Sequence, residues 1–395
     1  MSRIAFFNIP AWGHTNPTIE VVRNLVNQGH TVRYYTFEMF RETLEAAGAE
    51  VICCDHALPP DPKHLEKKVG KDFASLIEMV THTTLALDGK VCQELRTFGP
   101  DVIVSDSVCF WGKLFAQKLG ISYVCSTTTF AFNRQTARLM KPKTGEMLRS
   151  LLGMSRIGKQ VQQLQKHGYQ IHRITDLLQN DNDTNTIVFT SKEFQPMAET
   201  FSNKYAFVGP SLPVDVSQEE KKEKKRPLLY IALGTVMHQR KKFCQNCIEA
   251  LKNMDVEAVI SAGTQENLEA MGTLPSNIKA EVRVDQLSVL KEADVFLTHC
   301  GMNSVSESIW YGVPMVLNPQ QSEEAAVANR AAELGLGVLL EAERPAAIQK
   351  AIRQILNDPA YLTKTNELRQ TFMKAGGAVK AAEYILNCRG NSKIN

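Results

Sequence analysis

The clearest candidate for chemistry in the sequence is the stretch 294–329, where an apolar run leads into a polar turn. The run 295–297 predicts a buried strand, and the polar turn 298–304 precedes a short helix expected at about 305–311. A second apolar run, 313–317, is continuous rather than alternating, as in a parallel strand that is covered on both faces. Open parallel sheets bind ligands beyond the carboxyl ends of their strands, so this turn is where we expect a ligand.

The polar turn offers several groups that could hold an anion. Its glycine, Gly301, lets the backbone approach a ligand closely. The free N–H groups and the dipole at the start of the following helix favour negative charge. Further donors are the side chains of His299, Asn303 and Ser304. Glu323 and Glu324 follow the second strand at the same edge, so a nucleoside diphosphate joined to a hydroxyl-rich group would match. A plain turn with capping residues fits the spacing equally well.

A second pair of candidate residues lies in the first part of the chain. His14 is expected in the loop between a strand at 4–9 and a helix that Asn16 caps, with Pro17 as its first residue. Asp106 ends another expected strand, so both side chains can lie at one sheet edge. A positioned imidazole can take a proton from a hydroxyl, and a carboxylate can orient that imidazole. His14 could instead do no more than cap the helix beside it.

Length and composition predict a globular protein with two α/β domains. The chain has 395 residues, of which 44% are hydrophobic and 22% charged, and this length allows two separate cores. Strand and helix patterns alternate in 1–214 and again in 228–395, which predicts parallel sheets. The stretch 215–227 between them carries charge and no core residues, and it is the expected linker.

Several classes of function are disfavoured. The net charge of +3 gives no strong field for nucleic acid, and the lack of an apolar run of about 18 residues argues against stable membrane insertion. The turn at His14 lacks G-x-G-x-x-G, and no Walker A motif occurs, which weakens the dehydrogenase and P-loop interpretations. No signal-peptide pattern is present, so we expect a cytoplasmic location with the nine cysteines reduced. Cys244 and Cys247 form a C-x-x-C without a second pair, so zinc is not expected there.

The stretch 294–329 resembles the donor-binding signature of the UDP-sugar-dependent glycosyltransferases of family 1, most closely the bacterial macrolide and flavonoid group. The match comprises T-H-x-G-x-N-S at 298–304, Glu307, Y-G-V-P-M-V at 311–316, and an acidic pair after the next proline. The resemblance runs from residue 3 to about 386. It implies the α/β GT-B fold, two Rossmann-like domains facing each other across a cleft. The first would hold the acceptor and the catalytic base, the second the nucleotide sugar, and the last helix would return to the first domain.

The resemblance also implies roles for individual residues. His14 would be the general base, and Asp106, rather than Asp101, its partner. Glu307 would accept hydrogen bonds from ribose hydroxyls, and Thr235 would contact a phosphate. The implied donor-binding residues are Thr235, Arg283, Val284, Gln286, His299, Gly301, Asn303, Ser304, Glu307, Glu323 and Glu324. Further contacts to donor or acceptor are implied for Gly13, Phe110, Trp111, Ser126, Thr127, Thr128 and Phe130, although core packing would also explain the aromatic residues.

The sequence departs from the family pattern at three positions. Arg283 stands where the family has an aromatic residue that stacks on the nucleobase, and a guanidinium plane can stack as well. Asp285 replaces a proline, and Glu324 replaces a glutamine that donates to sugar hydroxyls. Because an ionised glutamate only accepts hydrogen bonds, Glu324 leaves the identity of the sugar open. Arg283 leaves the identity of the nucleobase open.

The resemblance implies an inverting transfer of a sugar from a nucleotide sugar, with UDP as the expected nucleotide, to a hydroxyl of a small, largely apolar acceptor. Neither a metal nor another cofactor is expected, because the donors of the turn take the metal's role and no D-x-D motif lies near them. A monomer or a dimer is expected. Two alternatives stay open. One is a nucleotide-sugar epimerase or hydrolase on the same fold, and the other is a non-catalytic auxiliary protein.

Overall fold

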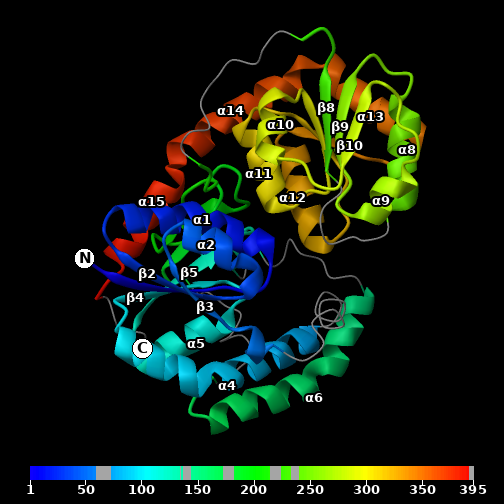
Figure 1. Cartoon of the computed structure of the whole chain (residues 1–395). Helices are drawn as coiled ribbons and strands as arrows, with labels where there is room; N and C mark the ends of the chain where they lie inside the picture. The colour runs from blue at the N-terminus through cyan, green and yellow to red at the C-terminus, as the bar shows by residue number, and fades with distance from the viewer. Residues whose placement is uncertain are drawn as a thin grey trace. The chain divides into compact units, whose positions relative to one another are not determined.

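The computed structural model shows two compact α/β units, which are described separately below (Figure 1). It describes residues 1–58, 73–133, 135–136, 144–171, 182–213, 224–232 and 240–390. The first unit comprises Met1–Phe189, Met197–Pro213 and Gly376–Asn395. The second comprises Thr190–Pro196 and Val214–Ala375.

The segment Thr190–Pro196 belongs to the second unit, although it falls within the predicted first domain, 1–214. Arg330 holds it there, because its guanidinium donates to the carbonyl oxygens of Glu193, at 2.9 Å, and Phe194, at 3.1 Å. The ring of Phe194 also packs against Phe372, with ring centroids 6.0 Å apart. These contacts join residues far apart in sequence, so the composition of the segment does not indicate that it belongs to the second unit.

The first unit is built on a seven-stranded parallel sheet with the strand order β3-β2-β1-β4-β5-β6-β7. Its strands are β1 (Arg3–Phe7), β2 (Thr31–Thr36), β3 (Glu50–Cys53), β4 (Val102–Asp106), β5 (Ser122–Thr127), β6 (Thr186–Val188) and β7 (Tyr205–Phe207). Its helices are α1 (Trp12–Asn27), η1 (Glu38–Phe40), α2 (Arg41–Ala46), η2 (Asp55–Ala57), α4 (Phe73–Phe98), α5 (Phe110–Leu119), α6 (Thr144–Lys166), η4 (Ala198–Thr200) and α15 (Gly377–Asn387). Every residue of β4 and β5 is buried, as expected for central parallel strands.

The second unit has a six-stranded parallel sheet with the order β10-β9-β8-β11-β12-β13. Its strands are β8 (Leu228–Ala232), β9 (Glu257–Ser261), β10 (Ile278–Glu281), β11 (Val295–Thr298), β12 (Met315–Leu317) and β13 (Gly337–Leu339). Its helices are α8 (Lys241–Leu251), α9 (Gln265–Ala270), α10 (Gln286–Glu292), α11 (Met302–Trp310), α12 (Ser322–Glu333), α13 (Pro345–Asn357) and α14 (Pro359–Ala375). Both predicted parallel sheets are therefore present.

The strand order reverses once in each sheet, and these two points position the candidate residues. In the first sheet the chain passes from β1 through β2 to β3 and then returns to the other side of β1 as β4. In the second sheet β8, β9 and β10 are followed by β11 on the other side of β8. Crossover connections on opposite sides leave a crevice beyond the carboxyl ends of the two central strands. His14 follows β1, and Asp106 is the last residue of β4. His299 directly follows β11.

Helix α1 begins five residues earlier than the sequence predicted. Its first turn is closed by the N–H groups of His14 and Thr15, both of which donate to the carbonyl oxygen of Ala11 at 3.1 Å. Pro17 consequently lies inside the helix and not at its first position, so the prediction of the helix start was wrong. The consequence for His14 is that it lies in a hydrogen-bonded helical turn instead of a loop.

The last helix, α15, packs against α1 in the first unit (Figure 1). Its buried face is formed by Ala378, Ala381, Ala382 and Ile385. The N–H of Gly377 donates to the carbonyl oxygen of Val208 at 2.6 Å, and the hydroxyl of Tyr384 donates to that of Lys204 at 2.7 Å. The C-terminal segment is thus tied to the end of β7 as well as to α1.

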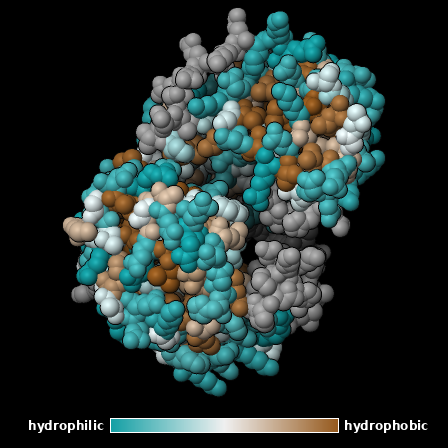
Figure 2. Space-filling model, in the orientation of Figure 1, coloured by the Kyte–Doolittle hydropathy of each residue, from teal (hydrophilic) through white to brown (hydrophobic). Residues whose placement is uncertain are grey.

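No helix in the described parts of the chain is long and apolar enough to cross a membrane. The face seen in Figure 2 is largely hydrophilic, with groups of apolar residues in each unit. Large apolar side chains with high exposure include Met39, Phe132, Met154 and Leu362.

A polar cluster around Asp88 joins α4 to α5 and to the end of α6. The carboxylate accepts hydrogen bonds from Nζ of Lys118 and from the hydroxyl of Tyr169, each at 2.7 Å. The ammonium of Lys118 also lies 4.7 Å from the centroid of the Tyr169 ring. Burial opposes ionisation of Asp88, but the hydrogen bonds from Lys118, Tyr169 and Cys92 outweigh it and lower the pKa of the carboxyl.

We expect Asp88→Asn to lower the free energy of unfolding by about 1–3 kcal/mol near neutral pH, because Lys118 and Tyr169 then lose a charged partner. A lowered carboxyl pKa stabilises the fold above the ordinary carboxyl pKa, and this contribution is lost as pH falls through the lowered value. Urea unfolding at pH 7 and at successively lower pH should therefore show the two proteins converging in acid. Glu383→Gln, which removes an exposed partner of Lys380, is the control and should change little. An equal difference at every pH would contradict this account.

Candidate active site

His14 and Asp106 are in direct contact in the first unit. Nδ1 of His14, in the first turn of α1, lies 2.8 Å from Oδ2 of Asp106 at the end of β4. The side chain of Asp106 is 1% exposed and that of His14 is 20% exposed. The second oxygen, Oδ1, accepts the N–H of Val108 at 2.8 Å, which fixes the plane of the carboxylate. Since an ionised carboxylate only accepts, Nδ1 carries the proton and Nε2 becomes the acceptor of the ring.

Thr128, one of the residues implied to contact donor or acceptor, lies at this site beside His14, a contact that was not predicted. Its buried hydroxyl oxygen lies 3.2 Å from Nδ1 of His14. The parallel register pairs Asp106 with Ser126, so Thr128 lies two residues beyond the partner of Asp106. That register is the signal that could have predicted the contact between Thr128 and His14. Of the neighbours that were predicted, Thr127 donates to the Ser107 hydroxyl at 3.3 Å, and the buried hydroxyl of Ser126 has no hydrogen-bond partner among the described residues.

A buried hydrogen-bond network supports the backbone of His14. The side-chain amide of Asn8, just after β1, donates to the carbonyl oxygen of His14 at 2.8 Å and to the hydroxyl of Tyr34 at 3.1 Å. The Tyr34 hydroxyl also lies 2.8 Å from that of Thr18, which donates to the carbonyl oxygen of Thr15 at 2.7 Å. All three side chains, Asn8, Tyr34 and Thr18, are buried. Such fully satisfied buried networks restrict a segment to one geometry, and here that segment carries His14.

In the second unit, the turn after β11 has an unusual backbone. Cys300 has a φ of +70°, a left-handed conformation that is uncommon for residues other than glycine. At Gly301 an added Cβ would lie 2.8 Å from Nε2 of His299, so any larger residue there would require the imidazole ring to move. Nδ1 of His299 is buried without a hydrogen-bond partner among the described residues. Burial lowers the pKa of His299, and the guanidinium of Arg240 acts in the same direction against the opposing charge of Glu324, so the ring is neutral at neutral pH.

Three of the predicted donor-binding residues lie together where α10 meets α11. Gln286 is the first residue of α10, and Ser304 and Glu307 belong to α11. The side-chain amide of Gln286 donates to the Ser304 hydroxyl at 3.2 Å and to the carboxylate of Glu307. The hydroxyl of Tyr230 donates to the amide oxygen of Gln286 at 3.2 Å and so fixes its orientation. Burial raises the pKa of the Glu307 carboxyl to about 7, although the hydrogen bond from Gln286 opposes that shift. Glu307 therefore changes charge within the physiological range.

Glu324 has a structural partner that the sequence did not reveal. One oxygen, Oε2, accepts the backbone N–H groups of Gln320 at 2.7 Å and Gln321 at 3.0 Å, so the carboxylate caps its own helix, α12. The other oxygen, Oε1, takes part in none of the hydrogen bonds among the described residues. Glu323 lies beside it on the exposed side of the helix.

Asp285, which stands where the family has a proline, holds the start of α10. Its side chain caps α10 by accepting the N–H of Ser288 at 3.4 Å and its hydroxyl at 2.6 Å. Arg283 is exposed, and Val284 is half-buried. Thr235 lies outside the described residues.

Comparison with known proteins identifies the family. Residues 245–378 match the family model described as Erythromycin biosynthesis protein CIII-like, C-terminal domain. Over 392 residues the chain is 32% identical to the NDP-glycosyltransferase YjiC of Bacillus subtilis (strain 168), with 97% of this chain and 96% of that protein covered. The chain belongs to the family 1 glycosyltransferases. The resemblance drawn from the stretch 294–329 is thereby confirmed.

Two solved structures show the same fold as this glycosyltransferase. The calicheamicin glycosyltransferase CalG4 matches with a TM-score of 0.79 and 26% identity, covering 99% of each chain. The glycosyltransferase VinC in complex with DTDP matches with a TM-score of 0.72 and 16% identity, covering 98% of this chain and 99% of that one. The predicted GT-B fold of two parallel α/β units is confirmed.

The aromatic residues suggested as ligand contacts in the glycosyltransferase are largely packed into its first unit. Phe110 and Trp111 belong to the hydrophobic core, with exposures of 4% and 1%. Phe130 is also 4% exposed, whereas Gly13 is exposed. Phe132, at 39% exposure, offers more apolar surface than any of these three aromatic residues.

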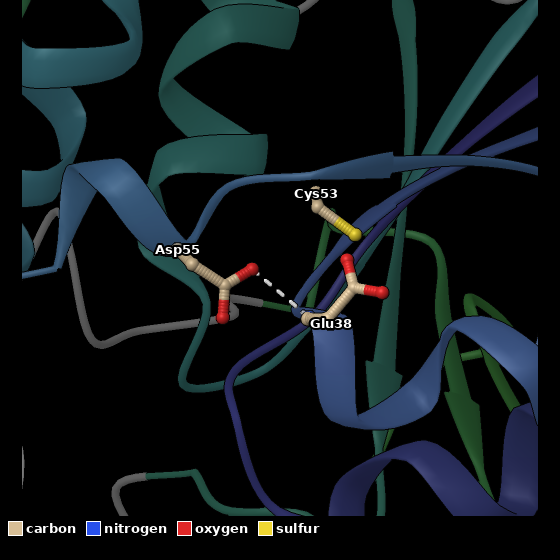
Figure 3. Close-up of side chains that lie close together, drawn as sticks. All are labelled: Glu38, Cys53 and Asp55. Carbon is tan, nitrogen blue, oxygen red and sulfur yellow. Dashed lines mark hydrogen bonds between the residues drawn. The ribbon is translucent and has the colours of Figure 1, made fainter.

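One group of side chains has the composition of a metal site, namely Glu38, Cys53 and Asp55 (Figure 3), and the sequence did not suggest it. Asp55 accepts the backbone N–H of Glu38 at 2.9 Å and so supports η1. Arg41 already supplies a cation, since its Nε donates to both oxygens of Glu38 and its Nη2 lies 3.0 Å from the sulfur of Cys53. We therefore assign these contacts to the packing of η1 on β3.

Thr128 and Asp106 contact the same nitrogen of His14, which gives a direct test of the first-unit geometry. Thr128→Val keeps the shape of the side chain and removes its hydroxyl, and it should slow glycosyl transfer by about 3- to 10-fold, the scale of one hydrogen bond. Thr128→Ser retains the hydroxyl and should stay close to the wild-type rate. Steady-state kinetics of the three proteins would decide, and equal rates for the valine and serine variants would exclude a role for the hydroxyl.

Proposed function

We propose that this glycosyltransferase transfers a sugar from a UDP-sugar to a hydroxyl of a small, largely apolar natural product, with inversion at the anomeric carbon and without a metal ion. The observation that carries the proposal is the 2.8 Å contact between His14 and the almost fully buried Asp106. It gives an imidazole whose tautomer is fixed and whose other nitrogen can act as a base. The family to which the chain belongs supports the reaction class.

In the proposed reaction, Nε2 of His14 takes the proton of the acceptor hydroxyl as the acceptor oxygen attacks the anomeric carbon. The bond between that carbon and the diphosphate oxygen breaks, and its electron pair leaves with the nucleoside diphosphate. A single displacement of this kind inverts the anomeric configuration. Asp106 stabilises the imidazolium that forms and keeps the ring in place.

The second unit would bind the donor in this scheme. The start of α11, with the N–H groups of its first turn and the Asn303 and Ser304 side chains, would face the diphosphate. The partnerless Nδ1 of His299 is a buried polar atom available to a ligand. Glu307 would accept the ribose hydroxyls in place of the amide of Gln286. These neutral and dipolar donors support a reaction that needs no metal.

The choice of nucleobase and acceptor rests on the relatives and on one exposed side chain. UDP is the proposed nucleotide, and the complex of VinC with DTDP makes a thymidine diphosphate sugar the first competitor to test. The erythromycin and calicheamicin names among the relatives favour natural-product acceptors. Arg283, exposed just before α10, is the candidate contact for the base.

A panel of UDP- and TDP-sugars with a pool of phenol and macrolide acceptors would test the proposal, with products identified by mass spectrometry and anomeric configuration by NMR. Acceptor-dependent nucleotide release with an inverted glycoside, unchanged by a chelator, is the expected result. Release without acceptor would support the hydrolase or epimerase alternative. Donor binding without any release across the panel would support the auxiliary-protein alternative.

His14→Ala should reduce turnover by at least about 100-fold, the usual contribution of a general base, and leave donor affinity nearly unchanged. Asp106→Asn should also impair turnover, because an amide can accept from Nδ1 but does not stabilise the imidazolium. Asp101→Asn is the matched control, since Asp101 lies at the opposite end of β4 and accepts the N–H of Arg3 at 2.8 Å. Rapid-quench measurements with saturating donor would separate turnover from binding. Near-normal turnover of His14→Ala would remove it from the mechanism.

Glu307 should make donor affinity depend on pH. Its carboxyl pKa of about 7 means that the free protein is partly protonated at neutral pH. The ionised form accepts ribose hydroxyls more strongly, so affinity for UDP-glucose should fall by up to about tenfold for each pH unit below 7.

Isothermal titration of UDP-glucose between pH 5.5 and 8.5 would measure this dependence, because the diphosphate of a nucleotide sugar does not itself titrate there. Glu307→Gln should bind more weakly at pH 8 and lose most of the dependence. A wild-type affinity that stays constant over this range would be inconsistent with ribose binding by the Glu307 carboxylate.

A further inference from the structure

Arg240 forms a nearly buried polar cluster at the carboxyl edge of the second sheet, which we call the Arg240 cluster and define as Arg240, Asn318, Gln320 and Glu343. The side chain of Arg240 is 10% exposed, and its Nη2 lies 2.6 Å from Oε1 of Glu343. Its Nη1 donates to the side-chain oxygen of Gln320. Arg240 and Glu343 lie outside the stretch 294–329, and Asn318 and Gln320 are not among the positions in it that match the family pattern.

The position of the guanidinium is fixed from several directions. The backbone N–H of Arg240 donates to the side chain of buried Asn267 at 3.1 Å, just before α8 begins. The guanidinium carbon lies 4.6 Å from the centroid of the Phe243 ring. On the other side, Oε1 of Glu343 also accepts from the side-chain amides of Asn318 at 3.0 Å and Gln320 at 3.4 Å. A charge that is almost buried and has this many partners is costly to misplace.

Gln320 connects this cluster to Glu324. Its side-chain amide accepts from Arg240 and donates to the carbonyl oxygen of Asn318 at 2.9 Å. Its backbone N–H donates to Oε2 of Glu324 at 2.7 Å, and the next N–H, that of Gln321, donates to the same oxygen at 3.0 Å. Arg240 is therefore linked to the carboxylate of Glu324 through one intervening residue, Gln320, and does not contact that carboxylate.

We propose that Arg240 is a positioning residue for donor specificity, because it orders the 318–321 turn and thereby directs the remaining oxygen of Glu324 toward the hydroxyls of the transferred sugar. The proposal rests on the proposed function and on the position of Glu324, which stands where the family has a glutamine that contacts the sugar. Loss of Arg240 frees the side chain of Gln320 and leaves Glu343 without its cation. The turn then holds Glu324 less rigidly, and a site that discriminates between hydroxyl orientations loses its fixed acceptor.

The experiment compares wild type with Arg240→Met, Glu324→Gln and the double variant. The matched control is Arg226→Met, which breaks the 2.7 Å ion pair with Asp255 at the amino end of β8, the opposite edge of the sheet. The first readout is the ratio of kcat/KM for the preferred UDP-sugar to that for its best-accepted epimer, beside the Kd for UDP alone. The second is amide hydrogen exchange of a peptide spanning 318–324, which needs no turnover.

Arg240→Met should lower the sugar ratio by about tenfold or more, the scale on which contacts to substrate hydroxyls discriminate, and change the UDP Kd by less than about threefold. Exchange in 318–324 should become faster, and Arg226→Met should alter neither quantity. In the Glu324→Gln background, Arg240→Met should have little further effect on the ratio, because the two residues act through one carboxylate.

An unchanged sugar ratio in Arg240→Met, or additive effects in the double variant, would overturn the proposal and leave the cluster a purely structural role. A lack of sugar transfer by the wild-type protein would refute the proposed function instead. In that case, unchanged hydrogen exchange of 318–324 in Arg240→Met would by itself refute the ordering role of Arg240. Glu343→Gln keeps the volume and removes the charge, and it should show the same direction of change if Arg240→Met does not fold.

Discussion

The parallel pairing of β1 with β4 is the constraint on which the first-unit site depends. It pairs Phe7 with Ser105, so that the chain leaving β1 and the last residue of β4 emerge at the same edge. A shift of one residue would turn Asp106 to the other face of the sheet. Burial of every β4 residue opposes such a shift. The packing of the sheet therefore determines the position of Asp106 relative to His14.

The second unit repeats this logic with different chemistry. Its central strands, β8 and β11, have the same relation as β1 and β4, but the turn after β11 presents backbone N–H groups and a neutral histidine instead of a histidine–carboxylate pair. One sheet plan thus positions the proposed proton acceptor in one unit and the proposed diphosphate-binding turn in the other. Because the reversal of strand order defines both places, the duplication of fold carries no duplication of function.

The sequence was most informative where chemistry is encoded locally. Apolar runs predicted both sheets, and the polar turn after β11 predicted helix α11, although α11 begins at Met302, three residues before the expected start. The start of α1 was missed because the Asn16-Pro17 pair is a good helix start by itself, while the actual first turn depends on hydrogen bonds to Ala11. The contact of Thr128 with His14 and the cluster around Arg240 were missed for another reason. The partners of these two residues, His14 and Glu343, lie about a hundred residues away, and no spacing rule reports such contacts.

The last helix has a consequence for the order in which the protein is made. Helix α15 packs against α1, and its residues follow those of the second unit in the chain. During translation the surface of α1 that α15 covers therefore stays open while Val214–Ala375 is added. The first unit is completed only after the second has been synthesised, and until then the uncovered surface of α1 is one that chaperones or like chains can bind.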